Sequence, residues 1–185
     1  MELREAIYGR RATRGFTREP VSKELIEKLV DAAIHAPSAV NEQLWDFAIV
    51  QDTMLLDRIS AAAKAHMAKA MASSEFPRRL HENLDDPDFH VFYHAPVLIV
   101  ISAKSGDWAT ENASLAAENL MLAAYAQGLG SCWIGFAQRW LETEEGKGAI
   151  DVPEDFYPVA PIIVGHPSMI MPVVPRDPAR IRWIA

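Results

Sequence analysis

The strongest hydrophobic pattern in the chain is an unbroken apolar run, rich in β-branched residues, from Pro96 to Ser102. A run without polar alternation is typical of a strand that is buried on both faces of a sheet. Residues 159–165 repeat the pattern, and shorter strands are predicted at residues 45–50 and 131–136. Together these segments predict a central sheet of four to five strands.

Stretches with helical spacing of apolar residues lie between the predicted strands. One apolar stripe includes Leu25, Leu29 and Ala33. Ser22 is its expected N-cap, and Pro37 is its stop signal. Further helices are predicted at residues 1–8, 53–71 and 107–127, with a weak one after residue 136. Because no repeat or linker interrupts this order, we expect a single α+β domain over residues 1–185.

Glycines mark the ends of two predicted helices. Gly9 follows the first helix and is expected to be a left-handed cap. Gly128 and Gly130 end the longest buried helix, whose apolar set is expected to include Leu115. Residues 73–90 carry two prolines and a run of acidic residues, and we interpret them as a lid or a surface excursion.

Composition narrows the class of protein. The 185 residues are enough to bury one sizeable core, and 50% of them are hydrophobic. The formal net charge of −7 argues against a general nucleic-acid binder, which needs a basic face. The single cysteine, Cys132, excludes an intrachain disulfide and fits a reducing cytosol. With no leader pattern and no apolar run beyond about eight residues, we expect a cytoplasmic protein that does not enter a membrane.

Several familiar catalytic patterns are missing or weak in the sequence. Gly128-x-Gly130 follows a helix and lacks the third glycine of a dinucleotide loop. His90 and His94 are four residues apart, but the sequence around them disfavours a helix and carries no metal-binding motif. Cys132 has no recognisable base, so a buried small hydrophobe is the simpler interpretation. We therefore predict no catalytic side chain and no metal site.

Polar segments that lie far apart in the sequence remain to be explained. Arg10, Arg11 and Arg14 fall within five positions of an otherwise acidic chain, which by itself fits either a solvated basic turn or an anion site. The others are a Pro-Ser-x-x-Asn-x-Gln loop, a glycine-rich strand entry and a tail cation, at residues 37–43, 128–135 and Arg176. Cationic forks, amides and open backbone are typical of a protein that holds a cofactor.

The order and spacing of these segments are similar to those of one protein family. The chain resembles the nitroreductase-like family of oxidoreductases that depend on flavin mononucleotide (FMN), over nearly its whole length. The matching segments are Arg10–Phe16 with Pro20-Val21, Ala36–Trp45, Phe92–Pro96, Glu118–Ala124 with Gly128–Gly135, and Gly165–Pro167 before Pro175-Arg176. The resemblance implies an α+β fold with a mostly antiparallel sheet, in an intertwined homodimer with FMN at its interface.

The resemblance also implies which residues of one subunit bind the cofactor. It places Arg10 and Arg14 at the phosphate or ribityl side of FMN and Arg11 near the pyrimidine edge of the flavin. Arg176 is the expected tail cation that closes on the phosphate. The family usually has serine where Ala12 stands, so at this position only the backbone is expected to contact the flavin.

The remaining implied contacts come from two further segments. The backbone of Trp133, Ile134 and Gly135 is expected to lie against the flavin ring, with an N–H directed at the nitrogen that accepts hydride. The partner subunit is expected to contribute a loop whose contact residues are Pro37, Ser38, Asn41 and Gln43. In this loop, leucine replaces a common proline before Trp45.

The implied activity is ping-pong hydride transfer: NADH or NADPH reduces FMN, and a small organic acceptor such as a nitroaromatic or a quinone reoxidises it. Two alternatives stay open, a flavin-binding carrier or sensor without turnover and a specialised dehalogenating or flavin-fragmenting member. The tail, about residues 166–185, is expected to wrap the partner. Residues 72–93, with Phe76, Phe89 and Phe92, are expected either to roof the pocket or to belong to the core.

Overall fold

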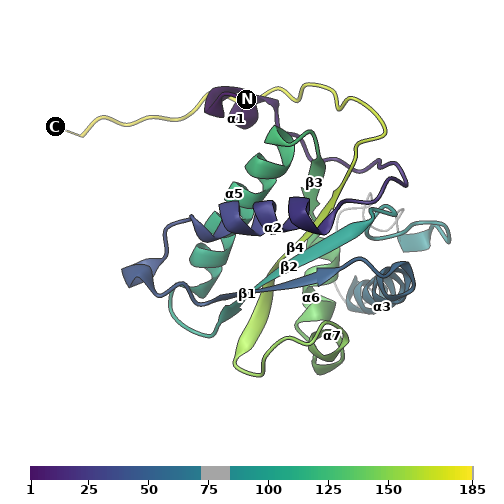
Figure 1. Cartoon of the computed structure of the whole chain (residues 1–185). Coiled ribbons are helices and arrows are strands. Elements are labelled where there is room, and N and C mark those ends of the chain that lie inside the picture. Colours follow the sequence, from purple (N-terminus) through teal and green to yellow (C-terminus); the bar gives the residue numbers. More distant parts are fainter. Residues whose placement is uncertain (72–83, 185) are drawn as a thin grey trace.

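The computed structural model describes residues 1–71 and 84–184 (Figure 1). In this part of the chain the strands form one four-stranded sheet in the order β1-β2-β4-β3, and every neighbouring pair is antiparallel. The strands are Trp45–Val50 (β1), Val97–Lys104 (β2), Gly130–Trp133 (β3) and Phe156–Gly165 (β4). Their positions and pairing confirm the sheet predicted from the apolar runs.

Strand β2 is buried on both faces, as its unbroken apolar run predicts. Val97, Ile99 and Ile101 belong to one hydrophobic core, whereas Leu98 and Val100 belong to a second core. This alternation follows from the two-residue period of a strand. Each of these five side chains is fully buried. The sheet therefore separates two cores, each of which needs helices to cover it.

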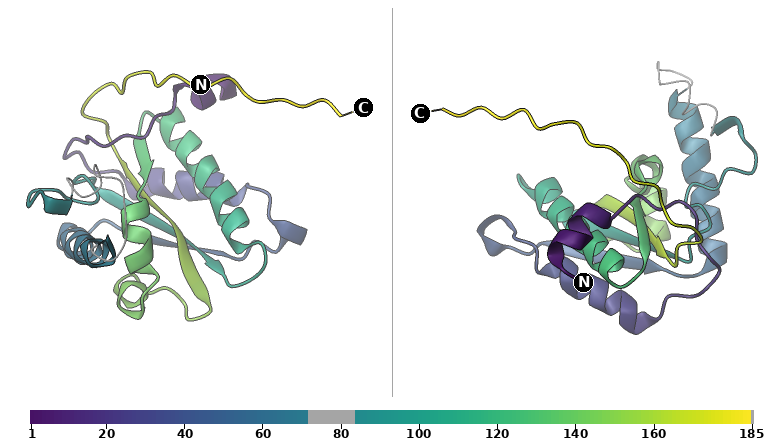
Figure 2. Two further views of the ribbon diagram at one scale, coloured as in Figure 1. Left: turned by 180° about the vertical axis from the view of Figure 1, so that it is seen from behind. Right: turned by 90° about the horizontal axis from the view of Figure 1, so that it is seen from above.

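Helices cover both faces of the sheet (Figures 1 and 2). One core is closed by α2 and α5, which span Lys23–Ile34 and Ala109–Ala126. The other is closed by α3, α6 and α7, which span Thr53–Met71, Gly135–Leu141 and Glu144–Ala149. A short helix packs on α5 and a 3-10 turn follows α2, and these are α1 (Leu3–Gly9) and η1 (Ala39–Asn41).

The structure corrects three expectations about helix ends and faces. Gly9 is not a left-handed cap, because it lies within α1, where a Cβ would come 2.2 Å from the Tyr125 hydroxyl oxygen. Leu115 is 46% exposed, because it lies on the face of α5 opposite the buried Ala113. Phe136 belongs to α6 and not to a strand. These differences concern packing partners that the spacing of residues in the sequence does not identify.

The C-terminal tail leaves the domain after β4. Residues 166–184 form no helix or extended ladder, and they run past α1 and away from the body of the molecule (Figures 1 and 2). Ile170, Trp183 and Ile184 are 98%, 93% and 95% exposed. The tail therefore does not bury these side chains against its own domain. Separately, none of the helices in the described ranges is long and apolar enough to cross a membrane.

Candidate functional site

The arginine segment, residues 10–16, is fixed at one edge of the sheet by backbone hydrogen bonds. Ala12 forms a parallel bridge with Ser131 of β3, and the Thr13 N–H donates to the Ser131 carbonyl oxygen at 3.0 Å. Gly130 permits this approach, because a Cβ there would lie 2.6 Å from the Thr13 side chain. The backbone at Ala12 is thus held by β3 without help from a side-chain hydroxyl.

The other end of the arginine segment pairs with the start of the tail. Phe16 forms an antiparallel bridge with Pro167, and the Ser168 N–H donates to the Gly15 carbonyl oxygen at 3.0 Å. The arginine segment therefore bridges β3 and the beginning of the tail. This pairing gives the cations between its two anchors a fixed backbone.

The three arginines of the segment point in two directions. Arg10 and Arg14 lie on the side of buried Cys132, where their positive charges oppose the rise in the pKa of the thiol that burial causes. The guanidinium carbon of Arg14 also lies 5.9 Å from the centroid of the Tyr93 ring, within cation–π range. Arg11 faces the tail instead, where it lines a cavity of about 530 Å³.

Two guanidinium nitrogens in this segment lack hydrogen-bond acceptors. Arg11 donates from Nη1 to the carbonyl oxygens of Tyr8 and Arg10, both at 2.8 Å. Its Nε and the Nε of Arg10 are buried, and neither makes a hydrogen bond within the described residues. Buried donors without an acceptor cost free energy, so such atoms mark a place where an anionic ligand fits. The buried Ser131 Oγ is also unpaired in the same region.

The backbone after β3 is open at Gly135. Ile134 is buried and its N–H donates to the Pro161 carbonyl oxygen at 2.8 Å, which fixes the chain just before the open position. Gly135 is exposed, no atom lies within 4 Å of the position a Cβ would take, and its N–H donates to no group in the described chain. Trp133 is half-buried beside them. A flat ligand has access to this backbone.

The loop at residues 37–43 is rigidly built but lies elsewhere. The Ala39 N–H donates to Asn112 Oδ1 of α5 at 2.9 Å, and the Gln43 N–H donates to Ser38 Oγ at 3.1 Å. Pro37, Asn41 and Gln43 are exposed. Figures 1 and 2 show this loop beyond the C-terminal end of α2, on the opposite side of the molecule from the arginine segment. A single chain therefore does not bring the two together.

The tail cation is also separate from the arginine segment within one chain. Arg176 is exposed in the extended tail and makes no hydrogen bond or ion pair with the described residues. The predicted set thus divides into three groups: the arginine segment with the backbone at residues 133–135, the loop at residues 37–43, and Arg176. The structure brings together only the members of the first group.

Aromatic side chains form a wall beside Arg14. The rings of Phe89 and Tyr93 pack edge to face with centroids 5.7 Å apart, and Phe89 lies 6.1 Å from Phe136. Burial raises the pKa of Tyr93, and the Arg14 charge opposes this rise. Phe92 is fully buried in the core. Phe76 is the third aromatic residue that was expected either to roof the pocket or to belong to the core. It lies in residues 72–83, which are outside the described residues.

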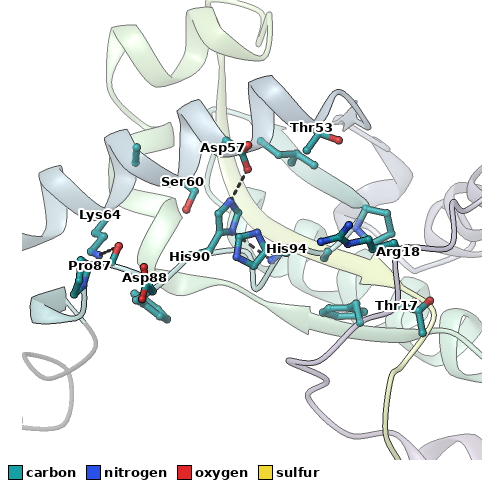
Figure 3. Close-up of a pocket in the computed structure, with 16 residues that line it drawn as sticks. Thr17, Arg18, Thr53, Asp57, Ser60, Lys64, Pro87, Asp88, His90 and His94 are labelled. Atoms are coloured by element: carbon teal, nitrogen blue, oxygen red, sulfur yellow. Dashed lines mark hydrogen bonds and ion pairs between the residues drawn. The ribbon is translucent and has the colours of Figure 1, made fainter.

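A second cavity, of about 860 Å³, lies between α3 and the segment before β2 (Figure 3). In this cavity a carboxylate oxygen of Asp57 and one ring nitrogen each of His90 and His94, atoms of the kind that bind metal ions, lie within 4.8 Å of one another. However, His90 Nδ1 accepts hydrogen bonds from two backbone N–H groups, at residues 92 and 94, so its proton is assigned to Nε2, 3.2 Å from Asp57 Oδ1. A protonated nitrogen does not bind a metal, so this is a hydrogen-bonded pair.

Comparison with known proteins explains why these features occur together. The family model described as the nitroreductase family matches residues 7–166. The chain belongs to the nitroreductase family. The fold expectation is confirmed as well, since a nitroreductase with bound FMN from Bacteroides fragilis superposes with a TM-score of 0.86 over 100% of both chains, at 24% identity.

Two curated relatives of this chain carry different names. A putative NADH dehydrogenase/NAD(P)H nitroreductase from Methanothermobacter thermautotrophicus is 30% identical over 174 residues, which cover 91% of this chain and 78% of the relative. An iodotyrosine deiodinase from Thermotoga neapolitana is 29% identical over 180 residues, which cover 94% and 93%. Membership of the family therefore leaves the acceptor open.

Three further residues that lie at the candidate site were not predicted from the sequence. Tyr93 and Glu118 lie within segments that carried the resemblance, but neither received a role, and Phe136 was assigned to a strand. Glu118 Oε1 lies 3.5 Å from Arg10 Nε, and Tyr93 packs under Arg14. The signal that would have identified them is their spatial proximity to the arginines, which depends on α5 and on the turn before β2.

Proposed function

We propose that this chain is an FMN-dependent oxidoreductase that takes electrons from NADH or NADPH and passes them to a small organic acceptor, such as a nitroaromatic or a quinone. The observation that carries the proposal is that the buried Nε atoms of Arg10 and Arg11 make no hydrogen bond within the described chain, in a segment bridged to β3, the strand that leads to the open N–H of Gly135. These groups fit an anionic tail and a flat ring. Bound FMN would supply the hydride chemistry.

In this proposal the arginines bind FMN by charge and by hydrogen bonding. Arg10 and Arg14 hold the phosphate or ribityl end, and Arg11 stabilises the pyrimidine edge, where negative charge develops when the ring is reduced. The opposite directions of Arg11 and of the other two support separate tasks. Arg176 closes on the phosphate once the tail is in place. Guanidinium groups suit these tasks because they present several donors in a fixed plane.

The backbone and the aromatic wall would set the position of the ring. The free N–H of Gly135 donates to the ring nitrogen that receives hydride, and the absence of a Cβ lets the ring approach. Phe89, Tyr93 and Phe136 exclude water from the adjoining space. Cys132 takes no part, because it is buried and its pKa is raised.

We further propose that the working unit is a homodimer. Apolar side chains are exposed on α1, on α5 and along the tail, and they include Leu3, Ile7, Tyr8, Leu115, Ile181, Trp183 and Ile184. A surface of this kind is unusual for a monomer and is typical of a subunit interface. The partner would contribute Pro37, Ser38, Asn41 and Gln43, which its own arginine segment does not approach. Each FMN site would then use residues of both chains, with the tail wrapped around the partner.

A spectroscopic titration tests the proposed function. Purified protein is stripped of flavin and titrated with FMN, and binding is followed by the shift of the flavin absorption bands. The FMN-loaded protein is then mixed anaerobically with NADH or NADPH. We expect saturable binding, bleaching of the flavin by at least one nucleotide, and recovery of colour when an acceptor is added. Gel filtration of the same sample measures the oligomeric state.

The outcomes separate the candidate functions. Absence of FMN binding would overturn the proposal altogether. Binding without bleaching by either nucleotide would favour a flavin carrier or sensor. The acceptor panel contains a nitroaromatic, a quinone and a halogenated phenol, because one of the relatives is named a deiodinase. Turnover with the halogenated phenol alone would favour a dehalogenating member.

A further inference from the structure

The segment that carries Tyr93 adopts an uncommon backbone conformation. Tyr93 and His94 are consecutive residues with φ of 51° and 53°, in the left-handed region that disfavours residues with a Cβ. Glycine occupies neither position. The conformation therefore depends on interactions that hold the turn from outside.

His90 supplies most of these interactions through one ring nitrogen and its carbonyl group. Its Nδ1 accepts the N–H of Phe92 at 3.2 Å and the N–H of His94 at 3.4 Å, and its carbonyl oxygen accepts the N–H of Tyr93 at 2.9 Å. The Ala95 N–H donates to the Phe92 carbonyl oxygen at 3.0 Å. Every N–H of the turn thus has an acceptor, and two of the four depend on the imidazole.

Helix α3 fixes His90 from the opposite side. Asp57 Oδ1 lies 3.2 Å from His90 Nε2, and Ser60 Oγ, nearly one helical turn further on, accepts the Val91 N–H at 2.9 Å. Figure 3 shows the Asp57 carboxylate pointing at the His90 ring, with His94 beside it. The His90 side chain is only 11% exposed, whereas the Asp57 side chain is 58% exposed, so the ring is buried and the carboxylate reaches it from the solvent side. The carboxylate holds the ring in the tautomer that leaves Nδ1 free to accept.

The turn places Tyr93 in the candidate site. Its ring lies under the guanidinium group of Arg14 at 5.9 Å and packs against Phe89, which in turn contacts Phe136 beside Gly135. A change in the turn would displace this wall and remove a partner from Arg14. The hydrogen bonds of His90 are therefore connected to the arginine segment through one side chain.

We propose that His90, in its neutral form, is a positioning residue that holds Tyr93 against Arg14 and so shapes the FMN site. The inference rests on the proposed function. Protonation at Nδ1 would place an N–H against the two backbone N–H groups that it now accepts, and the turn would open. Activity and FMN affinity therefore require the neutral imidazole and fall when it gains a proton.

The surroundings of His90 favour the neutral form on balance, chiefly because the ring is buried. Burial lowers the pKa of His90, His94 lowers it further, and the hydrogen bond and charge of Asp57 act in the opposite direction. The titratable and charged groups that face the ring or line its cavity are Asp57 and Lys64 of α3, Asp88 and His94 of its own segment, and Arg18. Because both positive and negative groups surround the ring, the two backbone hydrogen bonds to Nδ1 determine which protonation state is compatible with the turn.

Two substitutions distinguish this role from simple packing. His90→Asn retains an acceptor for the N–H two residues on, as in an Asx turn, but has no titratable group. His90→Gln reaches toward Asp57 but lacks an acceptor at the Nδ1 position. His66→Gln is the matched control, because His66 lies on α3 and outside this cavity. Measurements are FMN affinity by fluorescence, kcat/KM between about pH 5 and pH 8, and nitrogen-15 shifts of the His90 ring.

We expect H90N to stay within about twofold of the parent near neutral pH, and H90Q to lose roughly tenfold in FMN affinity. The parent and H66Q should lose affinity as the pH falls through the pKa of His90, which burial places below the ordinary histidine value of about 6.5, and H90N should not. The ring shifts should report a neutral imidazole protonated at Nε2. If H90Q fails to fold, the pH dependence of FMN affinity and kcat/KM in H90N, together with the nitrogen-15 shifts of the His90 ring in the parent, still tests the inference.

Equal losses in H90N and H90Q, an unchanged acid limb in H90N, or a proton on Nδ1 at neutral pH would each overturn the inference. Failure of the parent protein to bind FMN is a different result, because it overturns the proposed function and this inference with it. Normal FMN binding and turnover in the parent, combined with any of the first three results, would overturn the role of His90 alone.

Discussion

Arg10 Nε lies 3.5 Å from Glu118 Oε1, yet it is buried and makes no hydrogen bond. The carboxylate is therefore close enough to compensate the charge of the guanidinium group without satisfying its N–H. An arrangement of this kind leaves the donor available to a second acceptor. In the proposed site that acceptor is the phosphate of FMN, which then competes with Glu118 for one cation.

We predict that Glu118→Gln tightens FMN binding several-fold. The substitution removes a negative charge near the phosphate, while Arg10 keeps its own charge. Its effect on stability should be small, below about 1 kcal/mol, because the glutamate side chain is 49% exposed and such pairs are worth little. Fluorescence titration of the flavin-free protein with FMN measures the affinity, and urea unfolding measures the stability.

The matched control for Glu118 is Glu111→Gln. It makes the same change of charge on an exposed position of α5, away from Arg10, and should leave FMN affinity unchanged. A loss of affinity in E118Q would show that the carboxylate orients the guanidinium group and does not compete for it. Equal tightening in both variants would point to net charge alone.

Arg10→Ala and Arg176→Ala should each weaken FMN binding by roughly 1.5–3 kcal/mol, the usual range for a hydrogen bond to a charged group. Riboflavin lacks the phosphate and serves as the internal control, so its affinity should change much less in the same two variants. Isothermal titration with both ligands gives the comparison. Unchanged FMN affinity in both variants would falsify the assignment of these residues to the phosphate.

The sequence predicted the sheet and most helices because burial dictates residue type at those positions. The run at residues 97–101 lies between two cores, so both faces must be apolar, and the strand is readable without knowledge of its neighbours. Helix α3 occupies Thr53–Met71, as expected, and Gly128 ends α5 with φ of 77°. In each case the residues of the segment itself are enough to predict the element.

Features that depend on contacts between distant segments were not predictable in the same way. Gly9 is needed for contact with Tyr125, which lies more than a hundred residues further on, and not for its backbone freedom. The left-handed turn at Tyr93 depends on a histidine whose tautomer is set by Asp57 of α3. The distance between the loop at residues 37–43 and the arginines of the same chain agrees with the family resemblance, which assigns the loop to the partner subunit, but the spacing of the residues alone does not predict it.

Gly130→Ala and Gly135→Ala should have opposite effects on stability. A Cβ at Gly130 would lie 2.6 Å from the Thr13 side chain, so the substitution should destabilise the fold by roughly 1–3 kcal/mol through overpacking and should displace the arginine segment. Gly135 opens α6 with free space around it, so alanine there should be neutral or stabilising by up to about 1 kcal/mol. Thermal unfolding of the flavin-free protein measures both.

FMN affinity distinguishes the same two glycine variants further. G135A retains its fold but places a methyl group where the flavin ring is proposed to lie, so its affinity should fall. G130A should lose affinity only as far as its arginine segment moves. Unimpaired FMN binding in G135A would argue against contact between the ring and this backbone.

Stability should decline as the pH falls below the ordinary histidine pKa of 6.5, because burial lowers the pKa of His90 in the folded chain. The unfolded chain then binds a proton that the folded chain does not, so stability rises with pH in this window and is fully present above it. Urea unfolding at several pH values measures the slope. The slope should be smaller in H90N, which has no imidazole at this position, and an identical slope in parent and variant would contradict this assignment.

His94→Asn should stabilise the protein by about 0.5–1 kcal/mol near neutral pH. His94 is held at φ of 53°, and asparagine enters the left-handed region at lower cost than most other residues. The substitution leaves intact the backbone N–H that donates to His90 Nδ1. The same change at His66, inside α3, should give no gain, because histidine and asparagine have similar helix propensities. Equal effects at both positions, measured by urea unfolding, would show that backbone strain at residue 94 is not the cause.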